Sequence, residues 1–439
     1  MGWFSLARSL YDSTKNVAGG GLAFLTLAIG LASTIGPTVQ NTNAAELTFG
    51  TNNHISAQGQ ADTNLSDARF IAQYVDQSGK VYAWGRNTSN ELQTGDTSDS
   101  RSLPYPMHLP SKAGKVKKVV RVGKDTRILD VNGNLWIVAA SGTLNNGSAE
   151  KDGSSIEASN VADVKGDMPE GNYSGRAVWL NTDGTLTVKG LAHPTYSLPN
   201  GIRITDYAHV DLTSDTVKIS AIGDDGKLYR FDNSPTASEV SGTSEPVIFK
   251  RIGARRGYND AYQGFYELIR ALDSQGRLWQ WIDPAKGTAG TPELVDTEQT
   301  RFKNLSDSGA AAIDTDGNPW SLEYDDSNKT KLTKLPLPNG DTAEEISGDD
   351  TSLLMVLDTQ NRVWTRGLNA YYSLGDGTNI PRYEWGRVKS TVDFGSDGNS
   401  CVAQMPTTGA PVGLSAMGLA ALLMGLAAVG IGVVRRAGR

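Results

Sequence analysis

The chain has 439 residues, of which 38% are hydrophobic and 20% charged, and its formal net charge is −7. This length suits one large domain or about two or three ordinary ones. The acidic balance argues against a nucleic-acid-binding protein, which needs a basic surface to neutralise phosphates. The single cysteine, Cys401, excludes an internal disulfide framework, and the four histidines show no metal-ligand spacing. We therefore predict no metal and no cofactor.

Residues 1–44 have the order of a secretory signal peptide. Arg8 and Lys15 precede an uncharged, apolar run that starts at Gly19. Pro37 breaks this run, and the small residues of Thr42-Asn43-Ala44-Ala45 offer a cleavage site. A basic segment, an apolar segment and a small-residue site in this order predict export from the cell. The alternative is an uncleaved membrane anchor.

A short phrase, Asp-x-x-Gly-x-apolar-aromatic, recurs in strong or weakened form through the middle of the chain. Its copies start 41 to 54 residues apart. The turn position of each copy is Gly79, Gly133, Gly184, Gly226, Gly276, Gly317 or Asn361. A repeat period of about 40–50 residues is typical of propellers and solenoids.

The residues around each copy distinguish between these architectures. An apolar, strand-like stretch precedes the phrase, as in Leu353–Leu357, and a second apolar-aromatic strand follows the turn, which indicates a β-hairpin. No long amphipathic helical pattern intervenes. The sequence therefore predicts an all-β fold, a seven-bladed β-propeller over residues 45–395. His54–Gln58 and Val388–Phe394 are the segments expected to close the ring.

The first and last copies share a longer pattern. Gly85-Arg86-Asn87 with Leu92 and Gly95 matches Gly367-Leu368-Asn369 with Leu374 and Gly377. This pattern resembles the regulator of chromosome condensation repeat family, which implies a seven-bladed propeller. The chromatin and nucleotide-exchange roles of that family are not expected here, because this propeller is predicted to be exported and acidic.

The C-terminus has three parts in order: a linker with the pentapeptide Met405-Pro406-Thr407-Thr408-Gly409 (residues 396–409), an apolar segment (410–434) and a basic tail (435–439). The apolar segment is long enough to cross a bilayer as a helix, and the arginines after it favour a cytoplasmic end. The arrangement resembles a sortase sorting signal, with Met405 in place of the usual Leu. This resemblance implies cleavage between Thr408 and Gly409 and attachment of Thr408 to peptidoglycan of a Gram-positive-type bacterium. The alternative is a single-span membrane protein.

We find no catalytic motif, so the sequence predicts a protein that is not an enzyme. The candidate ligand-binding loop is Ala254–Phe265, between the fourth and fifth repeats, with Arg255, Arg256, Tyr258 and Tyr262. Arginine and tyrosine are enriched at binding hot spots. The alternative is a loop that packs on its own blade. Packing is also the favoured interpretation of Tyr371, Tyr372, Tyr383 and Trp385, which fall inside the repeat phrase.

The sequence thus predicts a wall-anchored propeller at the cell surface, which acts as a binding or adhesion module for an extracellular glycan or protein. The partners expected from the sorting signal are a sortase and peptidoglycan, with the membrane as a transient anchor and no nucleic acid. The alternative is a surface carbohydrate-active enzyme, because propellers also host such activities. Carboxylates around the channel mouth would favour the enzyme, and an aromatic and arginine patch on one rim would favour adhesion.

Overall fold

In this computed structural model, the described residues are 45–46, 54–58, 70–76, 78–88, 92–93, 98–122, 125–138, 156–166, 177–189, 195–213, 216–232, 234–243, 245–259, 264–284, 289–324, 329–349 and 352–390. All of them belong to Ala44–Arg439, the larger of two compact units. The predicted signal peptide, Cys401, the sorting motif and the apolar C-terminal segment lie outside the described residues. No helix within the described ranges is long and apolar enough to span a membrane.

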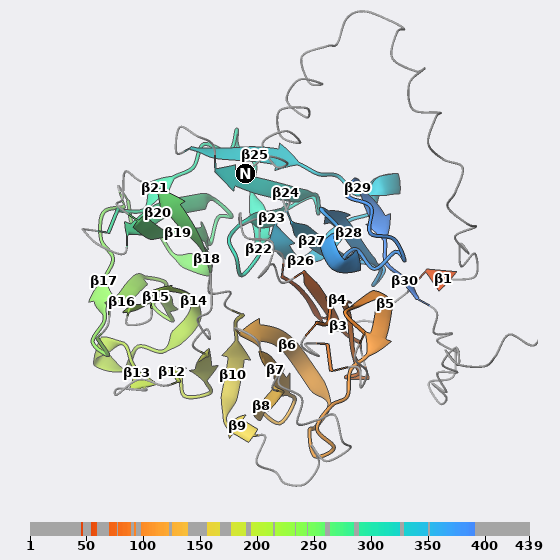
Figure 1. Cartoon of the computed structure of the whole chain (residues 1–439). Helices are drawn as coiled ribbons and strands as arrows, with labels where there is room; N and C mark the ends of the chain where they lie inside the picture. Colours follow the sequence, from red (N-terminus) through yellow and green to blue (C-terminus); the bar gives the residue numbers. More distant parts are fainter. Residues whose placement is uncertain are drawn as a thin grey trace, which may run out of the picture. The chain divides into compact units, whose positions relative to one another are not determined.

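Seven antiparallel sheets of four strands each form the fold, and each sheet uses four consecutive strands of the chain. The sheets follow one another in chain order around a common axis (Figure 1). The prediction of an all-β, seven-bladed propeller is therefore confirmed. We number the sheets as blades one to seven.

The bounds of the strands in the first four blades are as follows. Blade one comprises β2 (His54–Gln58), β3 (Ile71–Val75), β4 (Val81–Arg86) and β5 (Ser100–Pro106). Blade two comprises β6 (Val116–Val122), β7 (Asp125–Asp130), β8 (Leu135–Val138) and β9 (Ile156–Ala158). Blade three comprises β10 (Val161–Val164), β11 (Val178–Asn181), β12 (Leu186–Val188) and β13 (Thr195–Tyr196). Blade four comprises β14 (Ile204–Thr213), β15 (Thr216–Gly223), β16 (Leu228–Asp232) and β17 (Ser238–Glu239).

The remaining three blades have the same order of strands. Blade five comprises β18 (Phe249–Asn259), β19 (Gly264–Asp273), β20 (Leu278–Pro284) and β21 (Glu293–Leu294). Blade six comprises β22 (Phe302–Leu305), β23 (Ala311–Asp314), β24 (Pro319–Tyr324) and β25 (Thr330–Lys334). Blade seven comprises β26 (Ala343–Asp349), β27 (Leu353–Asp358), β28 (Val363–Gly367) and β29 (Arg382–Arg387). Three short 3₁₀ turns are η3 (Pro199–Gly201), η5 (Pro338–Gly340) and η6 (Ala370–Tyr372).

The core is divided among the junctions between blades. The described residues form seven apolar clusters, and each cluster draws its side chains from two neighbouring blades. Between blades one and two, for example, Ile71 and Val81 pack against Val119 and Trp136. Because each sheet buries both faces against its neighbours, a blade depends on its position in the ring for most of its stability.

The ring closes where blade one meets blade seven, without any exchange of strands. Ile55 and Trp84 of blade one share a cluster with Met355 of blade seven. The indole N–H of Trp84 donates to the carbonyl of Ser373 (2.9 Å). His54–Gln58 is the innermost strand of blade one rather than a completing strand of blade seven.

The two ends of the described chain also meet. Strand β1 (Ala45–Glu46) pairs antiparallel with β30 (Lys389–Ser390), outside the seven blades. Val388 packs in the closing cluster, whereas residues 391–394 lie outside the described residues. The expectation that strands from both ends close the ring is therefore wrong: every blade has its own four strands, and blades one and seven meet by side-chain packing.

The aspartate of the recurring phrase organises its turn. Asp273 accepts hydrogen bonds from the backbone N–H groups of Gln275 and Arg277 (2.8 and 2.9 Å) and from the indole N–H of Trp279 (2.9 Å). Blades two, six and seven repeat the contact between the aspartate and the tryptophan indole. Burial alone would raise the pKa of Asp273, but these hydrogen bonds hold it below its ordinary value. The carboxylate is therefore a structural acceptor.

The turn residues also connect each blade to the next. All seven turn positions have positive φ, from 62° at Asn361 to 89° at Gly317. The carbonyl of Gly276 accepts a hydrogen bond from the N–H of Phe302, the first residue of the next inner strand (2.8 Å), and four other junctions repeat this bond. A Cβ on Gly276 would lie 2.7 Å from the carbonyl oxygen of Phe302. Glycine is thus favoured by its backbone angle and by the close approach of the next blade.

Candidate functional site

Seven polar side chains line the axis of the propeller, one from each blade. Each lies on the innermost strand, opposite the residue that immediately precedes the recurring turn. They are His54, Lys118, Asp163, Asp206, Arg251, Asn304 and Glu345. We call this set the axial ring.

The local backbone structure explains why the axial residue occupies the same place in each blade. In blades two to seven, an irregularity of register, typical of a β-bulge, comes directly before the axial residue. The residue after the axial residue is buried in all seven blades. A bulge re-aims the side chains next to it. The polar side chain therefore faces the axis, and the apolar side chain that follows it packs at a junction between blades.

The charges of the axial ring pair with one another. Lys118 lies 2.9 Å from Asp163, and Lys165, just beyond β10, lies 2.7 Å from Asp206. His54 Nδ1 lies 2.6 Å from a carboxylate oxygen of Glu345. These contacts cross three of the seven junctions, so the ring joins blades electrostatically as well as lining the axis.

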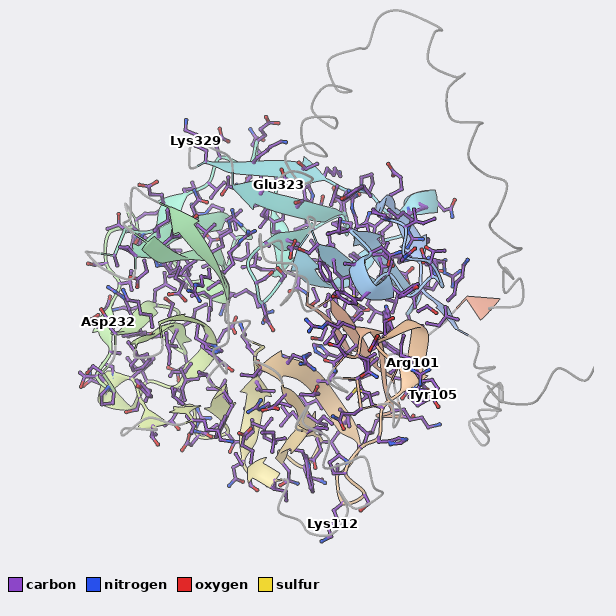
Figure 2. All side chains as sticks on the ribbon, viewed as in Figure 1. Arg101, Tyr105, Lys112, Asp232, Glu323 and Lys329 are labelled. Carbon is purple, nitrogen blue, oxygen red and sulfur yellow. The ribbon has the colours of Figure 1, made fainter. Side chains whose placement is uncertain are left out.

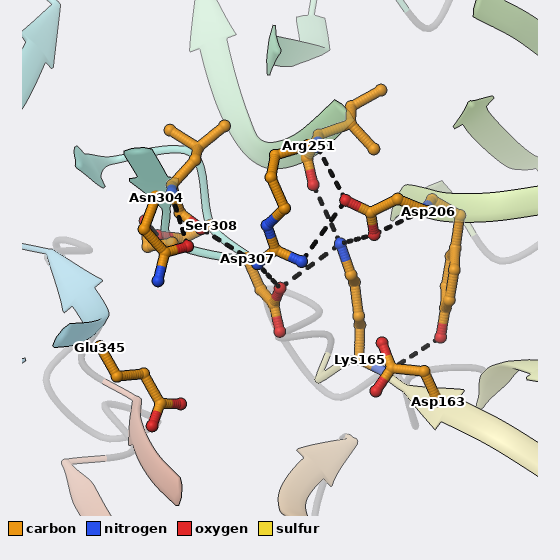
Figure 3. A network of polar contacts seen from close by, with 12 residues as sticks. Asp163, Lys165, Asp206, Arg251, Asn304, Asp307, Ser308 and Glu345 are labelled. Atoms are coloured by element: carbon orange, nitrogen blue, oxygen red, sulfur yellow. Dashed lines mark hydrogen bonds and ion pairs between the residues drawn. The ribbon is translucent and has the colours of Figure 1, made fainter. Parts of the chain in front are cut away.

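Asp307 adds a carboxylate from the short loop after β22. It lies 3.5 Å from Lys118 of blade two. It also lies 3.4 Å from Lys165 of blade three and 3.6 Å from Arg251 of blade five (Figure 3). Burial opposes the charge of Asp307, but these three cations hold its pKa far below the ordinary value. Three cations therefore face the three carboxylates of Asp163, Asp206 and Asp307.

The backbone holds the Asp307 loop in place. The N–H of Ala254 donates to the carbonyl of Asp307 (3.0 Å), and the hydroxyl of Ser308 donates to the carbonyl of Gly348 (3.0 Å). A Cβ on Gly253 would lie 2.7 Å from the backbone nitrogen of Gly309. The neighbouring blades thus hold this carboxylate at the axis.

The pairing of the axial charges helps to distinguish between the two functional hypotheses, a binding module and a carbohydrate-active enzyme. A glycoside hydrolase typically needs two carboxyl groups beside the substrate, one of them a general acid with a raised pKa. The axial carboxylates instead face cations, and the pKa of Asp307 is lowered. In the part of the chain that the structure describes, no group of three or more His, Cys, Asp or Glu side chains has an arrangement suited to a metal ion.

A second candidate surface lies where blade seven meets blade one, at the outer rim. The guanidinium of Arg101 lies 4.4 Å from the ring centre of Tyr105, and both project from β5 (Figure 2). The guanidinium of Arg86 lies 5.6 Å from the ring centre of Tyr371. We call the seam surface the set Arg86, Arg101, Tyr105, Tyr371, Tyr372 and Ile380, together with Tyr383 on β29, the outermost strand of blade seven.

The longer pattern shared by the first and last copies builds this rim. The side-chain oxygen of Asn369 accepts from the N–H of Leu374 (2.9 Å), and its amide donates to the carbonyl of Ile380 (2.9 Å). Asn87 makes the equivalent bond to the N–H of Leu92 (3.0 Å). Each asparagine therefore fixes the loop between the third and fourth strands of its blade.

The aromatic residues that the sequence analysis assigned to packing lie in different environments in the structure. Trp385 is buried, and its indole donates to the carbonyl of Leu335 in blade six (2.8 Å). The ring of Tyr371 lies 6.4 Å from that of Phe70, across the seam. Tyr383 is 46% exposed, so it is not a core residue.

The predicted ligand-binding loop has a different structure from the one expected. Ala254–Asn259 is the end of β18, and Gly264 begins β19, so the segment lies within blade five and not between blades four and five. Arg255 is exposed and Arg256 half-buried. Tyr262 and the side chain of Tyr258 lie outside what the structure describes. A long hairpin, rather than an irregular loop, carries these arginines.

Sequence reasoning missed the axial ring. The signal that indicates it is the pattern apolar–x–polar–apolar at the start of the inner strands, as in Val116-Lys117-Lys118-Val119 and Phe249-Lys250-Arg251-Ile252. No such sequence pattern marks Lys165 or Asp307, whose charges pair at the axis.

One segment of the chain matches a known repeat family. Residues 78–124 match the family model "Regulator of chromosome condensation (RCC1) repeat". No curated protein sequence matches the chain.

Several solved structures resemble the chain at low identity. Human WBSCR16 is 13% identical, with 79% of this chain and 84% of that chain covered and a TM-score of 0.40. PorZ, a bacterial surface component of the type-IX secretion system of Porphyromonas gingivalis, is 14% identical, with 80% of this chain and 39% of that chain covered and a TM-score of 0.42. YCF48 bound to D1 peptide is 12% identical, with 73% and 94% covered and a TM-score of 0.42. This chain spans about two fifths of the PorZ chain.

The axial pairing predicts that Asp307→Asn destabilises the propeller. Removal of this carboxylate leaves Lys118, Lys165 and Arg251 with excess positive charge, at a cost on the order of 1–3 kcal/mol in the free energy of unfolding. Chemical denaturation measures it, and added salt should recover part of the loss by screening. Asp316→Asn, on an exposed turn of the same blade, is the matched control. Equal stability of the two variants would contradict the assigned role of Asp307.

Proposed function

We propose that the protein is a binding or adhesion module, exported and attached to the cell wall through Thr408, whose ligand is an extracellular glycan or protein. A propeller with a segment that matches this repeat family fits a binding module. The observation that carries the proposal is the contrast between the two candidate surfaces. The charges at the axis neutralise one another, whereas arginine and aromatic side chains gather at the seam surface.

The chemistry of the seam surface supports a binding role. Ile380 is 67% and Tyr383 46% exposed, which places apolar area of blade seven in solvent. Tyrosine and arginine dominate the hot spots of protein interfaces, and both stack on the apolar faces of sugars or on other rings. A single exposed apolar residue needs no explanation, but a rim that combines several such groups supports ligand contact.

Two residues with a strained backbone also lie in the seam surface. Tyr371 and Tyr372 have positive φ (54° and 64°), a conformation that costs a non-glycine residue on the order of 1–3 kcal/mol. Such strain clusters at functional sites, where the surrounding structure maintains it. The bonds of Asn369 supply that support here.

A surface carbohydrate-active enzyme is the alternative function. Its sole structural support is the presence of four carboxylates, Asp163, Asp206, Asp307 and Glu345, near the axis. Each of them contacts a basic side chain. We therefore favour binding over catalysis.

The binding proposal is tested on glycan and matrix-protein arrays with the exported chain. We expect saturable binding to at least one component. Tyr383→Ala should weaken this binding about thirtyfold, which corresponds to the loss of one hot-spot side chain. Leu294→Ala removes a similarly exposed apolar side chain, 52% exposed, from blade five and should have no effect. No binding, or equal losses in both variants, would contradict the proposal, and cleavage of an arrayed glycan would favour the enzyme.

Attachment to the wall is tested by fractionation of cells that express the wild type or Thr408→Ala. A sortase joins the carbonyl of this threonine to wall peptide, so the wild type should be released by muramidase. The variant should stay in the membrane fraction. Extraction of the wild type by detergent alone would instead indicate a single-span membrane protein.

A further inference from the structure

A buried lysine and a buried aspartate meet at the junction between blades four and five. Lys218 lies on β15 and Asp283 on β20, and the Nζ of Lys218 is 2.6 Å from Oδ1 of Asp283. The two side chains are 3% and 0% exposed. Nζ also donates to the carbonyl of Pro284 (2.7 Å). The amine is therefore held against the carboxyl group in a site closed to water.

We propose that Lys218 and Asp283 condense to an intramolecular amide that joins blades four and five covalently. The neutral amine attacks the carboxyl carbon, so that a bond forms between Nζ and Cγ of Asp283. The bond from Cγ to the hydroxyl group of the protonated acid breaks, and the hydroxyl leaves with an amine proton as water. The balance is one amine and one carboxylic acid in, one amide and one water out, with no other reactant.

Burial favours the neutral amide over the ion pair. An ion pair taken out of water carries a large desolvation cost, which a neutral amide does not have. Burial raises the pKa of Asp283, although Lys218 and Arg230 act in the opposite direction. Contact at fixed geometry removes the entropy cost of bringing the reacting groups together.

Two neighbours are placed to assist the reaction. Arg230 contacts both carboxyl oxygens, with Nε 2.5 Å from Oδ2 and Nη2 2.8 Å from Oδ1, so it can stabilise negative charge when the carbon becomes tetrahedral. Glu267, 0% exposed, lies directly opposite Asp283 on the adjacent strand. Opposite residues of an antiparallel pair have Cβ atoms about 5 Å apart, which puts the Glu267 carboxyl in position to carry the proton.

The product leaves no new buried charge without a partner. The amide N–H keeps the carbonyl of Pro284 as its acceptor. Arg230 keeps Asp232, whose carboxylate is 3.0 Å away and 51% exposed. A link of this kind restrains the unfolded chain as a disulfide does, in a protein whose single cysteine allows no internal disulfide.

Other lysine–carboxylate contacts lack one of these conditions. Lys165 is as buried beside Asp206, but its Nζ is shared with a second carboxylate, that of Asp307, so it is not held against a single carboxyl group. Lys189 contacts Glu157 but is 50% exposed. These two lysines are internal controls that should remain unmodified.

Tryptic digestion of the full chain followed by mass spectrometry tests the proposal. Unmodified Lys218 gives the separate peptides 204–218 and 219–227, and Asp283 lies in 278–286. We expect instead a joined species of 204–227 and 278–286, lighter than the sum of the two by one water. Cleavage after Lys165 and Lys189 should be complete.

Two variants define the chemistry. Lys218→Arg keeps the positive charge but cannot form the amide, so the joined species should disappear. Glu267→Gln should lower the joined fraction at early times after synthesis, because it removes the proton carrier. Recovery of 204–218 and free 278–286 as the only forms from folded wild-type protein would overturn the proposal.

Discussion

The contact on which the propeller depends is the hydrogen bond between a repeat turn and the next blade, which forms at five of the junctions. The carbonyl of the turn glycine accepts the first N–H of the following inner strand, as Gly276 does from Phe302 and Gly317 from Ala343. The aspartate three residues earlier fixes the turn through the backbone and the tryptophan indole. The conformation of the turn thereby sets the spacing between neighbouring sheets. This spacing in turn determines how the apolar clusters pack at the junctions and where the axial ring lies.

The sequence predicted the parts of the fold that depend on short-range pattern. The turn phrase has nearly constant internal spacing, so the number of blades and the positive φ of the turn could be inferred from it. The axial ring could not be found in this way. The axial residue precedes its turn by 10 residues at Asn304 and by 22 at Arg251, because the hairpin between them varies in length. Strand β22 has 4 residues and β18 has 11. The same lengthening explains why the end of β18, with its polar Arg255 and Arg256, resembled a loop.

Different parts of the propeller serve stability and ligand contact. Paired charges consolidate the axis, and the buried site of Lys218 and Asp283 holds blades four and five together. Neither arrangement leaves a carboxylate poised for a substrate. The seam where the ring closes combines strained tyrosines with arginines, and the two ends of the described chain pair beside blade seven and blade one. Contacts that are distant in sequence, such as those of Asp307 with three blades, became visible only from the fold.

The most direct test of this account compares Gly276→Ala with Gly340→Ala in the free energy of unfolding. Both glycines have nearly the same φ, 74° and 72°, so both variants lose on the order of 1 kcal/mol from backbone strain. A Cβ at position 340 would meet nothing within 4 Å, whereas one at 276 would lie 2.7 Å from the carbonyl oxygen of Phe302. We predict that Gly276→Ala is the more destabilising by about 1 kcal/mol or more, because it also forces blades five and six apart. Equal losses in the two variants would contradict the claim that the turn glycines set the contact between blades.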